Sequence, residues 1–165
     1  MTEDGRRQLA IYLNDHLAGS TAAIELVRRA AGEHEGTPLG DFLAEFGTEI
    51  EQDRDALAAF MAANGVEPQR LKLVAAWAAE KAGRLKFNCA LLRRSPLTPC
   101  VELETLAIGI HGKELLWRAL RPDPGDDATA ARLDELIARA QRQHDAVERY
   151  RVEAGARALT AVRAP

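Results

Sequence analysis

Alanine is the feature that most limits what this chain can fold into. Of the 165 residues, 31 are alanine, whereas only 5% are aromatic and β-branched residues are sparse. Alanine has the highest helix propensity, and strands are enriched in the residue types that are scarce here. The sequence therefore predicts an all-α protein. Because 165 residues with 47% hydrophobic content are enough for a buried core, we expect a single domain over residues 1–165.

Apolar residues recur at helical spacing in four long segments. These are predicted to be helices at about residues 6–31, 39–64, 100–120 and 128–159. Short breaks rich in Gly and Pro separate the first helix from the second and the third from the fourth, which predicts two antiparallel hairpins. A stretch of about thirty residues, 67–99, separates the hairpins and is expected to be a partly helical crossover. This order is that of a four-helix bundle with one long crossover.

Each predicted helix carries a line of residues that is expected to face the core. The lines include Leu13, His16, Ser20 and Ile24, then Leu43, Ile50 and Asp53, then Leu106, Ile110, Glu114 and Trp117, and finally Leu133, Ile137, Ala140, His144 and Val147. One titratable residue of each line falls near the middle of its helix, namely His16, Asp53, Glu114 and His144. At a rise of about 1.5 Å per residue these four could lie at a similar depth and meet.

The helix order and two segments, LNDHLAGSTAAIELVRRAA and VELETLAIGIHGKELLWRAL, carry a resemblance to known proteins. The chain resembles the ferritin-like superfamily, and especially small bacterial ferritin-like proteins of uncertain function that are often linked to stress responses. This resemblance covers nearly the whole chain and implies a ferritin-like bundle. Active members hold two metal ions with one Glu on each of two helices and a Glu-x-x-His pair on each of the other two.

This sequence departs from that ligand pattern. Ser20, Ile50 and Gln141 stand where carboxylates would be needed, and Asp53 stands where an imidazole would be. Glu114, with His111 three residues before it, stays closest to the pattern. The resemblance therefore implies a bundle in which the dimetal ligands are largely lost, because hard cations need anionic oxygen ligands.

Two interpretations of the four inner polar residues remain open. They can form hydrogen bonds with one another and fix the register of the helices, in which case the protein has no cofactor. Alternatively His16, Asp53, Glu114 and His144 can hold one iron, manganese or zinc ion. The first interpretation is preferred, so we expect no cofactor.

The net charge of -3 hides a local asymmetry. Residues 70–94 contain seven Lys or Arg against Glu80 alone, whereas residues 41–55 contain six Asp or Glu against Arg54. A basic surface can attract an acidic protein, a second copy of the chain or a nucleic acid. Nucleic acid is disfavoured because aromatic and glycine-rich contacts are missing. The preferred interpretation is a solvated face with intramolecular pairs.

Other signals bear on location and activity. The sequence has no secretory leader pattern and no apolar run long enough to cross a bilayer, so we expect a cytoplasmic protein without a membrane partner. Cys89 and Cys100 lack metal or redox spacing and are expected to be small apolar residues, and Trp77 and Trp117 are expected to be packing anchors. No phosphate loop, serine elbow or HExxH helix occurs.

These observations predict a non-catalytic helical bundle that acts as an interaction or structural protein, in a stress setting as the resemblance implies. We expect it to self-associate as a homodimer, because alanine-rich faces permit close helix approach and two-fold pairing is the commonest assembly. An unidentified protein partner is compatible with the same interpretation. The alternative is a divergent metal-binding ferritin-like protein that acts as an oxidase or handles iron.

Overall fold

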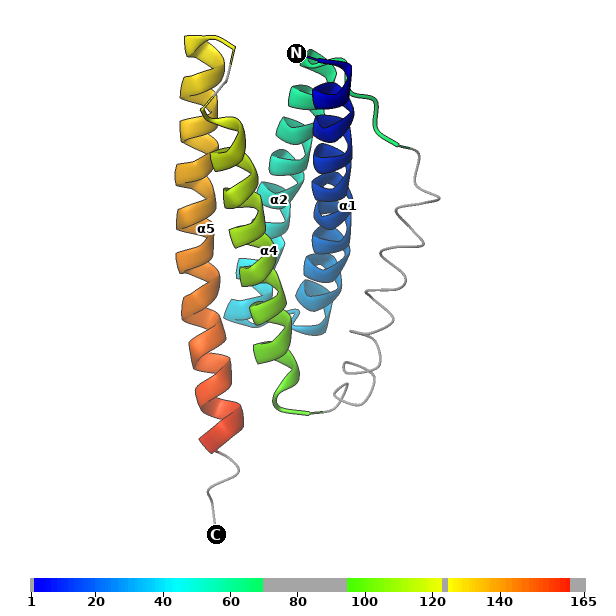
Figure 1. Cartoon of the computed structure of the whole chain (residues 1–165). Helices are drawn as coiled ribbons and strands as arrows, with labels where there is room; N and C mark the ends of the chain where they lie inside the picture. The colour runs from blue at the N-terminus through cyan, green and yellow to red at the C-terminus, as the bar shows by residue number, and fades with distance from the viewer. Residues whose placement is uncertain (1, 70–94, 123–124, 161–165) are drawn as a thin grey trace. The chain divides into compact units, whose positions relative to one another are not determined.

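The computed structural model describes residues 2–69, 95–122 and 125–160, and the regular structure of these residues is entirely helical (Figure 1). The helices are α1 (Glu3–Glu33), α2 (Pro38–Ala63), α4 (Thr98–Leu120) and α5 (Asp127–Thr160). Each bound lies within three residues of the one predicted from apolar spacing. The all-α prediction is therefore confirmed for the described residues.

The chain divides into two compact units, residues 1–90 and residues 91–165. The first contains α1 packed on α2, and the second contains α4 packed on α5. In each unit the two helices run antiparallel and are joined by a short turn, as predicted (Figure 1). The single domain and the ferritin-like bundle stay predictions. Most of the predicted crossover, with Trp77 and Cys89, lies outside the described residues.

The turn of the first hairpin is built by capping groups. Thr37 is the N-cap of α2, and its hydroxyl accepts a hydrogen bond from the backbone N–H of Gly40 at 3.1 Å. Gly36 has φ of 74°, a conformation that favours glycine. Gly40 packs against the end of α1 so closely that a Cβ atom there would lie 2.1 Å from the carbonyl oxygen of His34. The short turn therefore depends on glycine at both positions.

The interior of the first hairpin is mainly apolar, and its buried polar side chains are Asn14 and Asp53. The side chains buried most completely are Leu13, Val27, Leu43 and Met61. Asn14 of α1 is 5% exposed and bonds the chain just after α2: its Nδ2 donates to the carbonyl of Glu67 at 3.3 Å, and its Oδ1 accepts from the N–H of Gln69 at 2.7 Å. These bonds attach the end of the hairpin to α1.

The second hairpin has a well-defined register between α4 and α5. Near one end, Arg121 donates two hydrogen bonds to Asp134, at 2.7 and 2.9 Å. Near the other end, a Cβ atom at Gly155 would lie 3.3 Å from the sulfur of Cys100, which is buried as expected. Trp117 is 1% exposed, so its predicted packing role is confirmed.

The buried face of α5 differs from the predicted one. Leu133, Ala140 and Val147 are buried as expected, but the residues buried between them are Leu136 and Gln143. Ile137 and His144, which were predicted to face inward, are only partly covered. Because a helix has 3.6 residues per turn, positions three and four residues from an inner residue flank it about equally, and apolar spacing cannot choose between them.

Candidate functional site

The four candidate ligands are divided equally between the hairpins. His16 and Asp53 lie in α1 and α2 of the first hairpin, and Glu114 and His144 lie in α4 and α5 of the second. Asp53 is buried at 3% exposure, as its inner position predicts. The other three are partly exposed.

In the first hairpin, His16 is partly buried beside an aromatic ring. Its ring meets that of Tyr12 edge-on, with 4.8 Å between centroids and 81° between planes. Burial lowers the pKa of His16 below its usual 6.5, and the nearby Asp15 opposes this shift only in part. Ser20, which stands where the resemblance expects a carboxylate, donates its hydroxyl to the carbonyl of Leu17 at 2.7 Å. Its hydroxyl thus bonds within its own helix.

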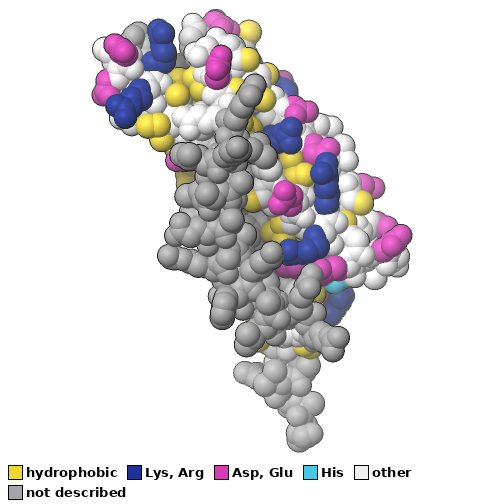
Figure 2. Space-filling view, turned by 90° about the vertical axis from the view of Figure 1, so that its right-hand side faces the viewer, with side chains coloured by type: hydrophobic (Ala, Val, Ile, Leu, Met, Phe, Trp, Pro, Cys, Tyr) yellow, Lys and Arg dark blue, Asp and Glu magenta, His cyan; other side chains and the backbone are white. Residues whose placement is uncertain are grey.

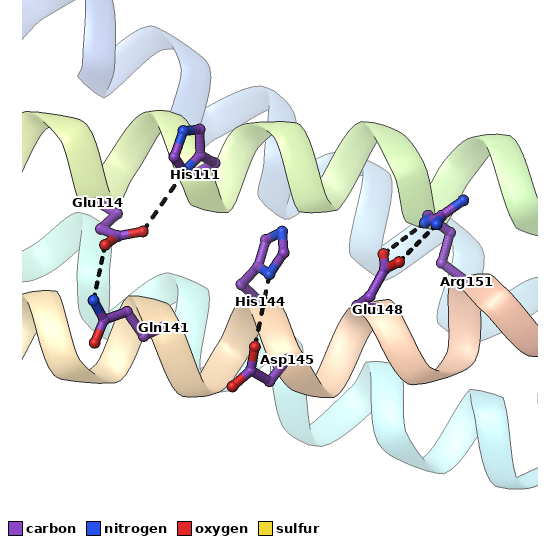
Figure 3. A network of polar contacts seen from close by, with 7 residues as sticks. All are labelled: His111, Glu114, Gln141, His144, Asp145, Glu148 and Arg151. Carbon is purple, nitrogen blue, oxygen red and sulfur yellow. Dashed lines mark hydrogen bonds and ion pairs between the residues drawn. The ribbon is translucent and has the colours of Figure 1, made fainter.

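In the second hairpin, Glu114 lies at the centre of a polar network between α4 and α5 (Figure 3). Its carboxylate accepts hydrogen bonds from Gln141 at 3.0 Å and from Arg118 at 2.8 Å, and His111 Nδ1 lies 3.6 Å away. The hydrogen bond from Gln141, followed by that from Arg118, lowers the pKa of Glu114. The carboxylate that stays closest to the ferritin-like pattern is therefore engaged by an amide and a guanidinium group.

His144, one turn after Gln141 on α5, does not form an ion pair with Glu114. Its side chain is 40% exposed, and its Nδ1 lies 3.9 Å from Asp145 (Figure 3). The next charged pair on α5 is Glu148 with Arg151, joined by two hydrogen bonds of 2.6 Å. The bond from Arg151 lowers the pKa of Glu148, and the bond to Glu148 raises the pKa of Arg151. Arg151 also lies 3.8 Å from Glu104 of α4, which extends the network across the hairpin.

Sequence reasoning missed three buried polar residues, Asn14, Glu102 and Gln143. Gln143 is 3% exposed and accepts a hydrogen bond from Lys113 at 2.5 Å, which joins α5 to α4. Its position three residues after Ala140 is compatible with an inner place, but His144, four residues after Ala140, fits the same pattern equally well. Asn14 offered no comparable signal, because two of its three partners, Glu67 and Gln69, are more than 50 residues along the chain.

The described residues hold no group of three or more His, Cys, Asp or Glu side chains arranged to bind a metal ion. Across residues 2–69, 95–122 and 125–160 there is also no helix with the length and hydropathy needed to span a membrane. Comparison with protein-family models, with curated proteins and with solved structures finds no match for this chain. The ferritin-like resemblance therefore stays a prediction.

The predicted charge asymmetry is visible only in its acidic part. Asp41, Glu45 and Asp55 of α2 are exposed, and Glu51 is paired across the hairpin with Arg28 at 2.6 Å. The basic stretch 70–94 lies outside the described residues. On the face shown in Figure 2, the coloured acidic and basic side chains are interspersed, with small hydrophobic patches between them.

Both helices of the second hairpin carry two exposed apolar residues seven positions apart, Ile108 and Leu115 on α4 and Val152 and Leu159 on α5, and the pair on α4 includes the most exposed of the four. Ile108 is 67% exposed and Leu115 is 49% exposed, and because seven residues are nearly two full turns, both lie on one side of the helix. We call this side the α4 outer face. Its central line is Val101, Ile108 and Leu115, flanked on one side by Glu104, His111 and Arg118 and on the other by Thr105, Gly112 and Ala119. It carries an apolar line between charged and small residues.

Proposed function

We propose that this chain is a non-catalytic helical protein that acts by binding a protein surface through the α4 outer face. The observation that carries the proposal is the exposure of Ile108 and Leu115. Single exposed apolar residues need no explanation, but two large ones aligned on one helix face, with a polar flank, are typical of an interaction site. The stress setting and a ferritin-like scaffold come from the resemblance and belong to the same proposal.

The chemistry of the polar residues supports a binding role over a catalytic one. The central carboxylate of the second hairpin, Glu114, bonds Gln141 and Arg118. A carboxylate with a lowered pKa that bonds two donors is a poor proton acceptor, and a metal ion would have to compete with Arg118 for it. These contacts are suited to holding α4 on α5 and thereby presenting the outer face of α4.

The alternative, a metal-binding protein, needs His16, Asp53, Glu114 and His144, of which Glu114 and His144 belong to the second hairpin (Figure 3). A site there would need Glu114 to give up its bonds and two side chains to turn toward it. We therefore place binding of a protein surface first.

The test compares the full chain with an Ile108→Glu variant and with Val152→Glu, a matched control. Val152 is also an exposed apolar residue of the second hairpin, at 55%, and with Leu159 it forms the corresponding pair on α5, so this control separates the face of α4 from that of α5. All three proteins should keep the same helical content and melting temperature within a few degrees, because both substituted side chains are solvated.

Each protein is then immobilised and challenged with the chain itself and with purified candidate proteins. The proposal expects binding by the natural chain and by Val152→Glu, and loss of binding in Ile108→Glu. Equal binding by all three proteins, or binding of neither the chain nor any candidate, contradicts it.

A further inference from the structure

The α4 outer face is complementary to itself when two copies are placed antiparallel. Its apolar line is Val101, Ile108 and Leu115, spaced seven residues apart, so these side chains follow one line along the helix. In an antiparallel pair with the two-fold axis between positions 111 and 112, Ile108 of one copy lies opposite the partner's Leu115, and the reverse contact follows by symmetry. The two most exposed apolar residues of α4 then cover each other.

The charged flank fixes the direction of the pairing. Glu104, His111 and Arg118 lie along one side of the apolar line, also spaced seven residues apart. Their side chains are well exposed, at 58%, 60% and 52% respectively. Antiparallel pairing places Glu104 opposite the partner's Arg118 twice, once on each side of the axis. Parallel two-fold pairing would instead place this charged flank against the partner's small flank, so it would form neither of these two attractive pairs.

The contacts that these two charges make within the chain are compatible with this arrangement. Arg118 bonds Glu114, but a guanidinium group carries five N–H donors and can bind a second carboxylate. Glu104 lies 3.8 Å from Arg151, longer than a hydrogen bond.

The other flank permits a close approach of the two helices. Thr105, Gly112 and Ala119 are small, and a Cβ atom added at Gly112 would meet nothing within 4 Å. A glycine inside a helix destabilises it by about 1 kcal/mol relative to alanine, and the described residues offer no packing that requires glycine here. A second helix lying against Gly112 would use the space that the missing side chain leaves.

We propose that the partner of the α4 outer face is a second copy of this chain, bound antiparallel through α4. This inference rests on the proposed function, because it names the partner of the same surface. A single pair of helices buries an area at the low end of stable interfaces, so the dimer should dissociate in the micromolar range.

The first test measures the dimer dissociation constant by analytical ultracentrifugation from low to high micromolar concentration. Ile108→Glu should weaken the dimer at least tenfold, and Val152→Glu should not change it. Glu104→Arg alone and Arg118→Glu alone should each weaken it about tenfold, because two attractive pairs become two repulsive ones. The double exchange, Glu104→Arg with Arg118→Glu, should restore it to within about threefold of the natural chain.

The second test uses cross-linking and does not depend on charge. In a background of Cys89→Ser and Cys100→Ser, Gly112→Cys lies beside the expected axis and should form an intermolecular disulfide. Gly109→Cys, where a Cβ would also meet nothing within 4 Å, points away from the central line and should not.

Three results would overturn the self-pairing: a monomer at all concentrations, a double exchange as weak as the single variants, or equal cross-linking at positions 109 and 112. A chain that is monomeric but still binds another protein in a way that Ile108→Glu abolishes would reject self-pairing and leave the proposed function standing. If Ile108→Glu changes no interaction, neither with a second copy nor with another protein, both proposals are rejected.

Discussion

The side-chain oxygen of Asn14 accepts a hydrogen bond of 2.7 Å from the backbone N–H of Gln69, although the two residues are 55 positions apart. The same amide donates to the carbonyl of Glu67, so one side chain satisfies two backbone groups of the segment that leaves α2. Asn14 is 5% exposed, so water cannot readily replace these bonds. The start of the long connection is therefore attached to the middle of α1.

Replacing Asn14 should destabilise the first hairpin more than an ordinary polar substitution does. Asn14→Ala leaves two backbone groups without their partners and should lower the free energy of unfolding by about 1 to 3 kcal/mol. Asn14→Asp should be at least as harmful, because a carboxylate can accept from Gln69 but cannot donate to Glu67. Urea unfolding measures both.

The control for Asn14 is Asn64→Ala at the exposed C-cap of α2, where the side chain donates to the carbonyl of Phe60 at 2.8 Å. It should change the free energy of unfolding by about 0.5 kcal/mol or less. Equal effects at positions 14 and 64 would show that the bonds of Asn14 contribute no special stability.

Replacing Gly40 and replacing Gly19 with alanine should change the stability of the chain in opposite directions. A Cβ atom at Gly40 would lie 2.1 Å from the carbonyl oxygen of His34, so Gly40→Ala forces the turn apart and should destabilise the chain by about 3 kcal/mol. At Gly19, inside α1, a Cβ would meet nothing within 4 Å, and Gly19→Ala should stabilise by about 1 kcal/mol through helix propensity. Thermal unfolding measures the stability of both variants. A Gly40→Ala variant as stable as the natural chain would contradict the close contact.

The helices could be predicted from the sequence because their signals are local. Apolar spacing defined each segment, and breakers such as Gly36 and Pro38 marked the turn between the first two. The close contact of Gly40 with His34 was not predictable, since it depends on the angle between two helices rather than on the residue pattern. The buried side of α5 was predicted one position off, at His144 instead of Gln143, because the contact with α4 selects between two equivalent neighbours.

The candidate site was predictable in residue type but not in contacts. The sequence identified Glu114 and His144 as polar residues among apolar ones, and both are partly covered. It did not indicate that Gln141, on the exposed side of α5, and Arg118 would share the carboxylate of Glu114. A long flexible side chain can bond any suitable group within its reach, including groups on another helix. Spacing along one helix therefore does not determine which residues pair.

Acidification should weaken the first hairpin through His16. Burial lowers the pKa of His16 from its usual 6.5, so the unfolded chain takes up a proton at pH values where the folded chain does not. The contribution to stability is therefore complete above pH 6.5 and declines as the pH falls through the lowered pKa of the folded chain. Urea unfolding between pH 7.5 and 5 should show this decline, and His16→Gln should flatten it.

The control for this pH dependence is His34→Gln at the C-cap of α1. It should leave the decline between pH 7.5 and 5 as steep as in the natural chain. If His16→Gln retains the full slope, another group is responsible.

The second hairpin should respond to acid in a lower pH range, through Glu114. Its pKa is lowered from 4.5 by the bonds from Gln141 and Arg118, so the ionised form is the stabilising one. That stability is present above pH 4.5 and is lost as the pH falls through the lowered pKa. Glu114→Gln should reduce the difference in melting temperature between pH 6 and pH 3. An unchanged difference would mean that the network around Glu114 does not contribute.

Metal removal should not change the stability of the purified chain. The metal alternative needs His16, Asp53, Glu114 and His144 to act together, and a bound ion would stabilise the folded state by mass action. We expect elemental analysis to find no stoichiometric iron, manganese or zinc, and a chelator to leave the melting temperature unchanged. His144→Ala should lower that temperature by the same small amount with and without chelator, since its side chain is 40% exposed. About one metal per chain, with a chelator effect that is absent in both His144→Ala and Asp53→Ala, would instead establish the metalloprotein.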